Sequence, residues 1–454
     1  MIEKLRAIVG AEFVRTDSAA CEAYGVDALK RGHRADVVVL PANTAEVAAI
    51  AKLCHETRTP LVPRGGGTGY TGGSVPVRGG VVVSLERLNR ILEIDEGNLL
   101  AVVEPNVVTG DLQDAVERVG LFYPPDPASL RTSVIGGNVA ENAGGPRAFK
   151  YGVTGRFVLG LEAVLPTGEI IRTGGKVVKN VVGYDLTHLL VGSEGTLAIL
   201  TKVVLRLVPK PPVQATLRAT FPSVTHAVDA VLRLVRARVI PAALELVDKD
   251  SLDAVAAYLG GRPLAPEGTG ALLLIEVDGL SELVAGEATR VEQACRDAGA
   301  TELLRARDDG ERAELWRVRY ELSPALKTIA PVKFNHDVVV PKARIPELFR
   351  LVDELKARHR VRLPCFGHVG DGNIHVNVMV ANDEDEIRRA HEAEEALFRG
   401  VVALEGSISG EHGIGFAKAK YLGLELGPDV IALMKRIKAA FDPHGILNPG
   451  KIFE

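Results

Sequence analysis

The first half of the chain alternates apolar and polar runs with the periods of strands and helices. A β-branched run at residues 35–40 predicts a strand, and helical spacing over residues 44–58 predicts an amphipathic helix that Asn43 or Thr44 caps. Residues 61–63 predict another strand, so the three elements form a βαβ unit. Further strands are predicted at residues 81–85, 91–95 and 101–104, and a helix at about residues 109–119.

Strand and helix patterns also alternate in the second half, after a proline-rich joint at residues 208–212. The strands are expected at residues 214–221, 243–247, 271–277 and 302–305, and the helices at 223–236, 251–259 and 282–298. Alternation of this kind on an antiparallel sheet predicts an α+β fold. Residues 316–323 are expected within one helix, a strand opens at residue 333, and the charge run at 384–395 indicates an exposed helix face.

The stretch Gly-His-Val-Gly-Asp-Gly-Asn-Ile-His-Val-Asn at residues 367–377 carries the strongest chemical signal. Asp371-Gly372 is typical of a two-residue hairpin turn, which would pair His368 with His375. Alternation then puts Asn377 on the same face as His375, while residues 374, 376 and 378 point into a core. The pattern predicts a polar face on a buried strand.

Directly opposed imidazoles about 5 Å apart at Cβ can share one divalent metal ion. In the Gly-Glu-His-Gly segment at residues 410–413, Glu411 could add an oxygen ligand and complete a His368, His375 and Glu411 site with open positions. Hydrogen-bonded packing of the two histidines is the alternative. The spacing favours the metal.

Residues 64–74, Arg-Gly-Gly-Gly-Thr-Gly-Tyr-Thr-Gly-Gly-Ser, contain a formal G-x-G-x-x-G pattern. A Rossmann loop opens a helix, whereas a strand follows here, so we predict no Rossmann fold. Successive glycine amides together with Thr68, Thr71 and Ser74 can still form an anion-binding nest. A purely structural glycine turn is the alternative, and the number of glycines favours phosphate binding.

Three more tracts rich in small or glycine residues follow, at residues 124–145, 179–186 and 192–197. Small side chains let the backbone press against a large flat ligand and donate amides to it. Glycine, at 47 of 454 residues, exceeds its usual share of about 7% because of these tracts.

Composition restricts the function classes. Apolar residues make up 46%, charged residues 25%, and the net charge is −4, so a nucleic-acid partner is disfavoured. The four cysteines lie far apart, which fits a reducing compartment. Because the chain has no Cys-x-x-Cys pair for an iron–sulfur or redox centre, another protein must take any electrons that leave it. The N-terminus lacks a secretory pattern and no apolar run approaches 18 residues, so we expect a cytoplasmic protein, with peripheral membrane attachment through a partner left open.

Together the four tracts resemble the FAD-binding domain of the vanillyl-alcohol-oxidase/p-cresol-methylhydroxylase superfamily. The histidine-rich stretch, the Gly-Glu-His-Gly segment and the terminal residues 441–451 resemble its FAD-linked 2-hydroxyacid dehydrogenase and oxidase branch, and the resemblance covers nearly the whole chain. It implies an α+β architecture: a two-part FAD-binding domain (1–208), a ferredoxin-like cap that binds substrate (213–420), and a C-terminal segment (421–454) that returns to the flavin.

The resemblance also implies which residues contact FAD. Some relatives attach FAD through a histidine in the first loop, where this chain has Thr68, so we expect non-covalent, dissociable FAD. The residues assigned to FAD are Arg64, Gly65, Gly66, Gly67, Thr68, Gly69, Thr71, Gly72, Gly73, Ser74, Pro127, Ser129, Thr132, Ser133, Gly136, Gly137, Asn138, Asn142, Gly144, Gly145, Gly192, Glu194, Gly195, Asn448 and Lys451.

For the substrate, the resemblance implies carboxylate contacts from Arg319, Ser323 and Lys333, and the four-residue spacing of the first two puts them on one helical face. The expected reaction is oxidation of a small D-2-hydroxy acid, such as glycolate or D-lactate, to the 2-oxo acid. A zinc-like or manganese-like ion would bind the substrate hydroxyl, His412 would take its proton, the Cα hydride would pass to flavin N5, and Asn377 would orient the substrate or a ligand.

Three other functions stay open at this point: a flavoenzyme of another reaction class on the same scaffold, similar to alkyl-dihydroxyacetonephosphate synthases; a non-redox metal hydrolase; and a non-catalytic FAD-binding subunit of an oxidase complex. The partners expected are a small 2-hydroxy acid and a separate electron acceptor. Oxidase-complex subunits with iron–sulfur centres and a homodimer are further options. The sequence specifies neither the acid, the metal nor the acceptor.

Overall fold

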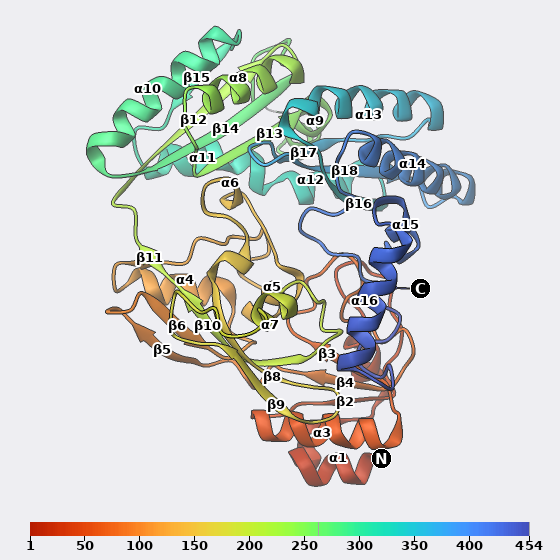
Figure 1. Ribbon diagram of the computed structural model, residues 1–454. Helices are drawn as coiled ribbons and strands as arrows, with labels where there is room; N and C mark the ends of the chain where they lie inside the picture. Colours follow the sequence, from red (N-terminus) through yellow and green to blue (C-terminus); the bar gives the residue numbers. More distant parts are fainter. Residues whose placement is uncertain (262, 454) are drawn as a thin grey trace. The chain divides into compact units, whose positions relative to one another are not determined.

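The computed structural model describes residues 1–261 and 263–453 and contains two compact units (Figure 1). Unit 1 comprises Met1–Gly145, Gly152–Lys210 and the chain from residue 411 onward. Unit 2 comprises Pro146–Tyr151 and Pro211–Gly410. Each unit contains both helices and sheets, as the predicted α+β class requires.

The first sheet of unit 1 has the order β1-β2-β4-β3. Its strands are β1 (Val14–Arg15), β2 (Val37–Val39), β3 (Leu61–Arg64) and β4 (Val81–Ser84). β2 and β3 are both parallel to β4, which lies between them, and α3 (Thr44–Thr57) is the crossover of the predicted βαβ unit. No helix lies between β3 and β4, so the glycine loop there does not open a Rossmann-type helix.

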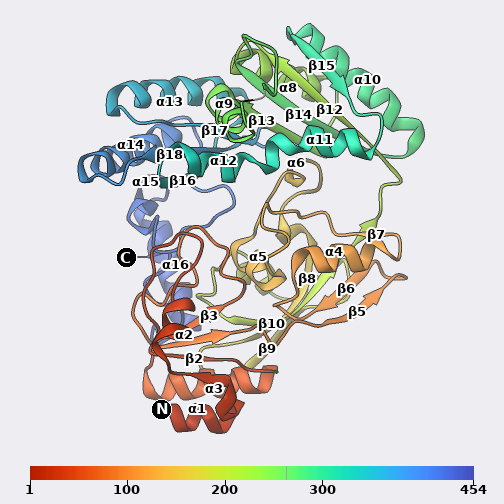
Figure 2. The same cartoon turned by 180° about the vertical axis from the view of Figure 1, so that it is seen from behind.

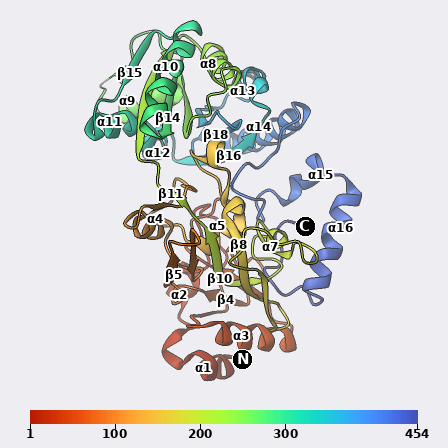
Figure 3. The same ribbon diagram turned by 60° about the vertical axis from the view of Figure 1, so that its left-hand side comes forward.

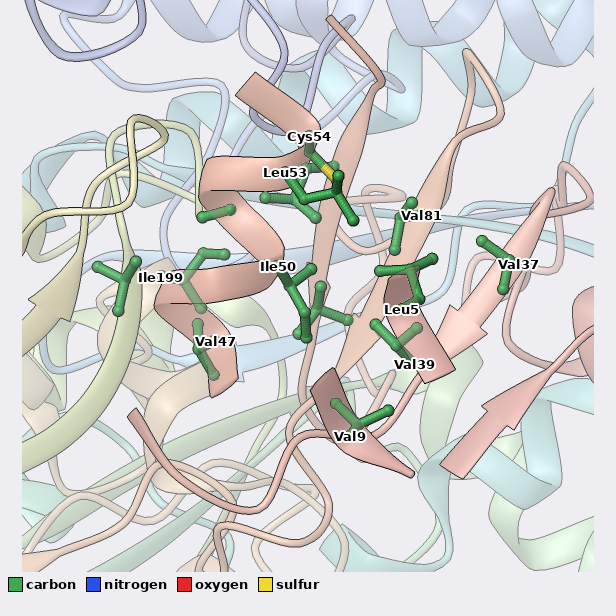
Figure 4. Close-up of a cluster of buried hydrophobic side chains, with 14 of the residues drawn as sticks. Leu5, Val9, Val37, Val39, Val47, Ile50, Leu53, Cys54, Val81 and Ile199 are labelled. Carbon is green, nitrogen blue, oxygen red and sulfur yellow. The ribbon is translucent and has the colours of Figure 1, made fainter. Parts of the chain in front are cut away.

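The helix α3 forms where the sequence predicted it. Asn43 is its N-cap, since the Asn43 side chain accepts from the Glu46 amide at 2.9 Å, and the Glu46 carboxylate accepts from the Ala42 amide at 2.7 Å. Its apolar face packs with α1 (Ile2–Val9) and the sheet in a core that includes Val47, Ile50 and Ile199 (Figure 4). This core packs α1, α3 and the first sheet of unit 1 against one another.

The second sheet of unit 1 is antiparallel, in the order β5-β6-β10-β8-β9. Its strands are β5 (Ile91–Asp95), β6 (Leu100–Val103), β8 (Val158–Val164), β9 (Ile170–Gly174) and β10 (Ile199–Arg206), and β7 (Leu121–Phe122) pairs separately with β11 (Val208–Pro209). The remaining helices of unit 1 are α2 (Ser18–Ala23), α4 (Thr109–Glu117), α5 (Ile135–Glu141), α7 (Leu186–Leu190), α15 (Leu422–Glu425) and α16 (Pro428–Phe441).

The C-terminal segment returns to unit 1, as the resemblance implied (Figure 3). After α16 the chain runs beside β3, where Leu447 forms a parallel bridge with Leu61 and the Asn448 amide donates to the Leu61 carbonyl at 2.7 Å. The last residues therefore lie directly next to the strand that leads into the glycine loop.

Unit 2 is built on one seven-stranded sheet in the order β15-β12-β14-β13-β17-β18-β16. Its strands are β12 (Val213–Phe221), β13 (Ala243–Asp248), β14 (Ala271–Gly279), β15 (Glu302–Arg305), β16 (Val332–Val339), β17 (Cys365–His368) and β18 (Asn373–Val380). The first four, numbered in chain order, follow the spatial order 4-1-3-2 with antiparallel neighbours, which is the predicted ferredoxin-like topology. The last three strands extend the sheet from β13.

Helices cover both faces of this sheet. One face carries α8 (Val224–Arg236), α10 (Ser281–Asp297), α13 (Ile345–His359) and α14 (Glu384–Ala403), and α14 exposes the predicted charged side. The other carries α9 (Lys249–Tyr258), α11 (Asp309–Tyr320) and α12 (Leu322–Ile329) (Figure 2), while α6 (Ala148–Tyr151) adds a short turn from residues 146–151. None of the helices in residues 1–261 and 263–453 is long and apolar enough to span a membrane.

The single helix predicted over residues 316–323 is wrong. α11 ends at Tyr320 and α12 begins at Leu322, so Arg319 and Ser323 belong to different helices and do not share one continuous face. Pro324 is the physical reason, because its ring has no N–H to donate and clashes with the carbonyl four residues earlier, which is that of Tyr320. Pro324 instead occupies the first turn of α12, where a proline is tolerated.

Candidate active site

The hairpin at residues 365–380 has a different register from the predicted one. His368 pairs with Asn373 and Phe366 pairs with His375, because the connection contains four residues, 369–372, instead of two. The shift is two residues, which is one full period of a strand, so both histidines keep the same face. They meet diagonally, with ring centroids 5.4 Å apart and the rings nearly perpendicular.

A polar face therefore crosses the middle of the unit 2 sheet. Registers of directly paired residues place His375 beside Asp337, Asn377 beside Asn335, and His368 beside Glu245. All of these side chains are buried or half-buried, whereas the alternate residues 374, 376 and 378 enter the core as predicted. Buried polar groups on a strand need partners, and the pair formed by His368 and Glu245 is bonded directly, with Nδ1 and Oε1 2.5 Å apart.

Glu245 is the site residue that sequence reasoning missed. It lies on β13 with no solvent exposure, accepts from Nε of Arg319 at 2.6 Å, and has Oε1 2.5 Å from Nδ1 of His368. Burial alone would raise the pKa of Glu245, but its neighbours His368 and Arg319, through electrostatic attraction and hydrogen bonds, lower it to about 2. The signal in the sequence was a lone acid within the apolar run at residues 242–247.

Glu411 is joined to unit 2 by the residue before it. The Gly410 amide donates to the Asp337 carboxylate at 2.8 Å, and a Cβ on Gly410 would clash with the buried Asn373 side chain, so glycine suits this close approach. One ligand atom from each of His368, His375 and Glu411 lies within 4.8 Å of the others. Two imidazole nitrogens and a carboxylate oxygen are a donor set that suits zinc or a similar divalent ion.

Two cationic side chains accompany this cluster. Arg319 is buried, with its guanidinium 5.0 Å above the Phe366 ring, and Phe366 in turn packs 5.3 Å from His375. Burial, followed by the charges of Lys327 and Arg319, lowers the pKa of Lys333 to about 8. Because like charges at one buried place repel, an anion such as a carboxylate would relieve both.

Ser323 and Asn377 differ in how firmly they are held. Ser323 is half-buried in the first turn of α12. Asn377 is fully buried, and its Nδ2 donates to the carbonyls of Pro364 and His375 at 3.2 Å each. These bonds leave Oδ1 of Asn377 as the atom that it could offer to another group.

In unit 1, His412 lies against the glycine loop. The Thr71 hydroxyl donates to the His412 carbonyl at 3.0 Å, and the Tyr70 and His412 rings lie 5.2 Å apart. The amides of Phe416 and Ala417 donate to the Thr71 carbonyl, at 3.1 and 3.2 Å. A Cβ on Gly72 would meet the Phe416 ring, so the loop and the segment after His412 form one packed body.

The glycine loop itself has the properties of an anion site. The amides of residues 66–70 have no protein acceptor in the part of the chain that the structure describes, and Gly67 and Gly72 have φ of 63° and 78°. Consecutive undonated amides in a half-exposed glycine loop are the feature that an anion-binding nest requires. Thr71 and Ser74 do not face such a ligand freely, since Thr71 holds His412 and Ser74 accepts from Arg64 at 3.2 Å.

Several other residues assigned to FAD also brace one another. Asn138 donates to Thr109 at 2.7 Å, and Asn142, at φ 55°, accepts from the Gly155 amide at 2.8 Å. Thr132 donates to the Ser129 carbonyl at 3.1 Å. Ser133 exchanges a hydrogen bond with Thr109 at 3.0 Å. These bonds fix the shape of a tract whose glycine backbone remains accessible at residues 136 and 137.

Asn448 and Lys451 tie the C-terminal segment to the end of the glycine loop, and Glu194 binds the segment after His412. The Glu194 carboxylate accepts from the amides of Ile414 and Gly415 at 2.8 and 2.6 Å, and burial raises its pKa against these bonds. Asn448 Nδ2 donates to the Gly73 carbonyl at 2.8 Å, and Lys451 Nζ donates to the Val75 carbonyl at 2.6 Å. The side chains of Asn448 and Lys451 therefore hold the end of the glycine loop, and that of Glu194 holds the backbone at Ile414 and Gly415.

Comparison with known proteins gives the same class. Residues 35–174 match the FAD binding domain family, and residues 210–452 match the family of FAD linked oxidases, C-terminal domain. Glycolate oxidase subunit GlcD of Bacillus subtilis (strain 168) is 42% identical over 99% of this chain and 96% of its own length. D-lactate dehydrogenase of Anaerostipes hadrus is 38% identical over 92% of this chain and 90% of its own length.

Solved structures agree on the fold. p-Cresol methylhydroxylase with substrate bound matches with a TM-score of 0.82 over 100% of this chain and 96% of that chain, at 20% identity. Fold and matched domains together define an FAD-binding oxidoreductase. The chain belongs to the FAD-linked oxidases, in the 2-hydroxyacid oxidase and dehydrogenase branch of the vanillyl-alcohol-oxidase/p-cresol-methylhydroxylase superfamily.

Proposed function

We propose that this enzyme oxidises a small D-2-hydroxy acid, such as glycolate or D-lactate, to the 2-oxo acid, with the help of a divalent metal ion. The observation that carries the proposal is the buried polar face, where the ligand set His368, His375 and Glu411 lies in the same cluster as two cationic side chains. The relatives named glycolate oxidase subunit and D-lactate dehydrogenase support this substrate class.

The residues divide the reaction between them. Arg319 and Lys333 hold the substrate carboxylate through charged hydrogen bonds, Ser323 adds a hydroxyl contact, and Asn377 orients the substrate through Oδ1. His368, His375 and Glu411 would hold the divalent ion, which would supply a Lewis acid that lowers the pKa of the substrate hydroxyl. His412 takes the hydroxyl proton as a general base. Bound FAD would supply the two-electron acceptor, at N5, for the Cα hydride.

In unit 1, the residues assigned to FAD supply binding. The undonated amides of residues 66–70 would donate hydrogen bonds to the pyrophosphate, and the accessible glycine backbone of the second and fourth tracts would hold the flavin and its ribityl chain. A separate electron acceptor must reoxidise the flavin, because all four cysteines are buried and free. Subunits with iron–sulfur centres are one form that this acceptor could take.

One anaerobic experiment tests the proposal. The purified, FAD-loaded protein is mixed with a panel of D- and L-2-hydroxy acids and the flavin absorbance is followed. A D-2-hydroxy acid should bleach the flavin and yield one 2-oxo acid per flavin. If no acid bleaches the flavin while an acyl-dihydroxyacetone phosphate is converted without net oxidation, the reaction class is that of the alkyl-dihydroxyacetonephosphate synthases instead.

We predict one FAD per chain, releasable by acid or heat, because Thr68 stands in the loop where some relatives have a histidine that bonds FAD. The measurement is flavin absorbance in the supernatant after precipitation of the protein. Flavin that stays with the precipitated polypeptide would contradict the non-covalent attachment.

A pH dependence follows from Lys333. Its pKa of about 8 means that the side chain is charged below pH 8 and neutral above it, so KM for the hydroxy acid should rise as the pH increases through about 8. Lys333→Met should raise KM about 10- to 100-fold at neutral pH, the effect of losing one charged hydrogen bond. It should also abolish the rise in KM near pH 8.

Lys327→Met is the matched control. Lys327 is exposed on α12 and lowers the pKa of Lys333 by charge repulsion. Removing the Lys327 charge should leave KM at neutral pH unchanged and should shift the rise in KM to a higher pH, because the pKa of Lys333 increases. A step near pH 8 that persists in Lys333→Met would assign it to another group.

A further inference from the structure

Glu245 occupies an unusual place for a carboxylate. It lies on β13, one of the inner strands of the unit 2 sheet, between Leu274 of β14 and His368 of β17, with no solvent exposure. Isolating a charge from water is costly unless other groups compensate it. Here both carboxylate oxygens are used, one by Arg319 and one by His368.

The bond to His368 determines which ring nitrogen carries the proton. An ionised carboxylate only accepts hydrogen bonds, so Nδ1 of His368 must be the donor. In the neutral ring Nε2 is then unprotonated and has a lone pair for a metal ion. A carboxylate that accepts from the far nitrogen of a ligating histidine also fixes the orientation of the ring and raises its basicity.

The bond to Arg319 acts on the other half of the site. Glu245 holds Nε of the guanidinium, and the Phe366 ring lies below its plane at 5.0 Å. The contacts with Glu245 and Phe366 fix the plane and direction of the Arg319 guanidinium group. Its terminal nitrogens Nη1 and Nη2 therefore keep one orientation. Those nitrogens are the pair that a carboxylate engages in a bidentate contact.

We infer that Glu245 is a positioning residue that orients both the metal ligand His368 and the carboxylate-binding Arg319. This inference rests on the proposed function, since it assigns a role toward that metal and that substrate. Because Glu245 contacts both side chains, the distance between the metal ion and the substrate carboxylate would be set by the fold of the sheet.

A second buried glutamate offers a matched control. Glu276 lies on the neighbouring strand β14, is 2% exposed, and accepts from Thr216, Arg312 and Trp316. It resembles Glu245 in burial and in pairing with an arginine of α11, but it bonds no histidine. Substitution of either glutamate removes a buried charge, and only Glu245→Gln also disturbs His368.

The experiment compares Glu245→Gln, Glu276→Gln and the wild type as full-length, FAD-loaded proteins. Affinities for Zn²⁺ and Mn²⁺ are measured by competition with a chelator. Glu245→Gln should bind metal about 10- to 100-fold more weakly, the usual effect of losing such a partner, and Glu276→Gln should bind it like the wild type. Equal affinities in Glu245→Gln and the wild type would overturn the inference.

A second measurement needs neither metal nor substrate. In metal-free protein labelled with ¹⁵N-histidine, the His368 signals are assigned by their loss in His368→Gln, and their shifts report which nitrogen is protonated. The neutral ring should carry its proton on Nδ1 in the wild type and in Glu276→Gln, and lose that preference in Glu245→Gln.

The two measurements separate the inference from the proposed function. A wild type that binds no metal, yet shows the Nδ1 proton and its loss in Glu245→Gln, contradicts the proposed metal site and leaves Glu245 as the residue that orients His368. A wild-type ring protonated on Nε2 overturns the inference, even if Glu245→Gln fails to fold.

Discussion

Replacing His412 by alanine should slow anaerobic flavin reduction by about 10²- to 10⁴-fold, the usual cost of removing a general base. Metal and flavin content should stay normal, because Thr71 holds the backbone carbonyl of His412 and not its ring. The loss should be smaller at high pH, where hydroxide can replace the imidazole. Rapid-mixing absorbance at the flavin band, with a saturating 2-hydroxy acid, measures the rate.

His444→Ala is the matched control, since His444 belongs to the same unit and its ring stacks on His55, with ring centroids 4.4 Å apart. It should reduce flavin at the wild-type rate. If His412→Ala loses its metal, His412 is a ligand and another group must be the base. If it reduces flavin normally, the proposed proton transfer is wrong.

Replacing His368 by alanine should remove both the metal and the activity, because it takes away one of only two nitrogen ligands in the proposed set. Elemental analysis after dialysis against buffer with the metal, together with the flavin-reduction rate, measures both effects. The flavin spectrum should be unchanged, since the FAD residues belong to unit 1 and His368 to unit 2.

His336→Ala separates the loss of a ligand from general damage. His336 is 4% exposed on β16 in the same sheet, but it packs against Phe398 on the opposite face from His375. It should lower the stability of unit 2 while keeping the metal. Full metal content in His368→Ala would show that the ion is bound elsewhere or that the two histidines are only packed together.

Local patterns predicted most of the strands and helices, because each of these has a complete signal within its own sequence. The helix α3, its Asn43 cap, and the apolar alternation of residues 374, 376 and 378 are of this kind. The turn between the two histidines was harder, since Asp371-Gly372 favours a two-residue loop but the sheet closes a four-residue one. The two histidines still lie on the predicted face of the sheet, because the register shift is an even number of residues.

The role of Glu245 could not be predicted from local sequence patterns. Its partner His368 lies 123 positions away, and Arg319 lies 74 positions away, so no local spacing connects them. Only the register of β13 against β17 brings the acid to the histidine. A charged residue inside an apolar strand was a visible anomaly, but the sequence alone did not say which group it would meet.

The hydrogen bonds from the last residues to the glycine loop have a consequence for biosynthesis. Asn448 reaches Gly73 across 375 positions and Lys451 reaches Val75 across 376, so the loop acquires these supports only after the chain has been made through residue 451. Domains generally fold as units and from the N-terminus during synthesis, but the glycine loop needs residues 448 and 451 before its contacts are complete. We therefore expect FAD to bind only after these residues have left the ribosome, and shorter nascent chains to remain colourless.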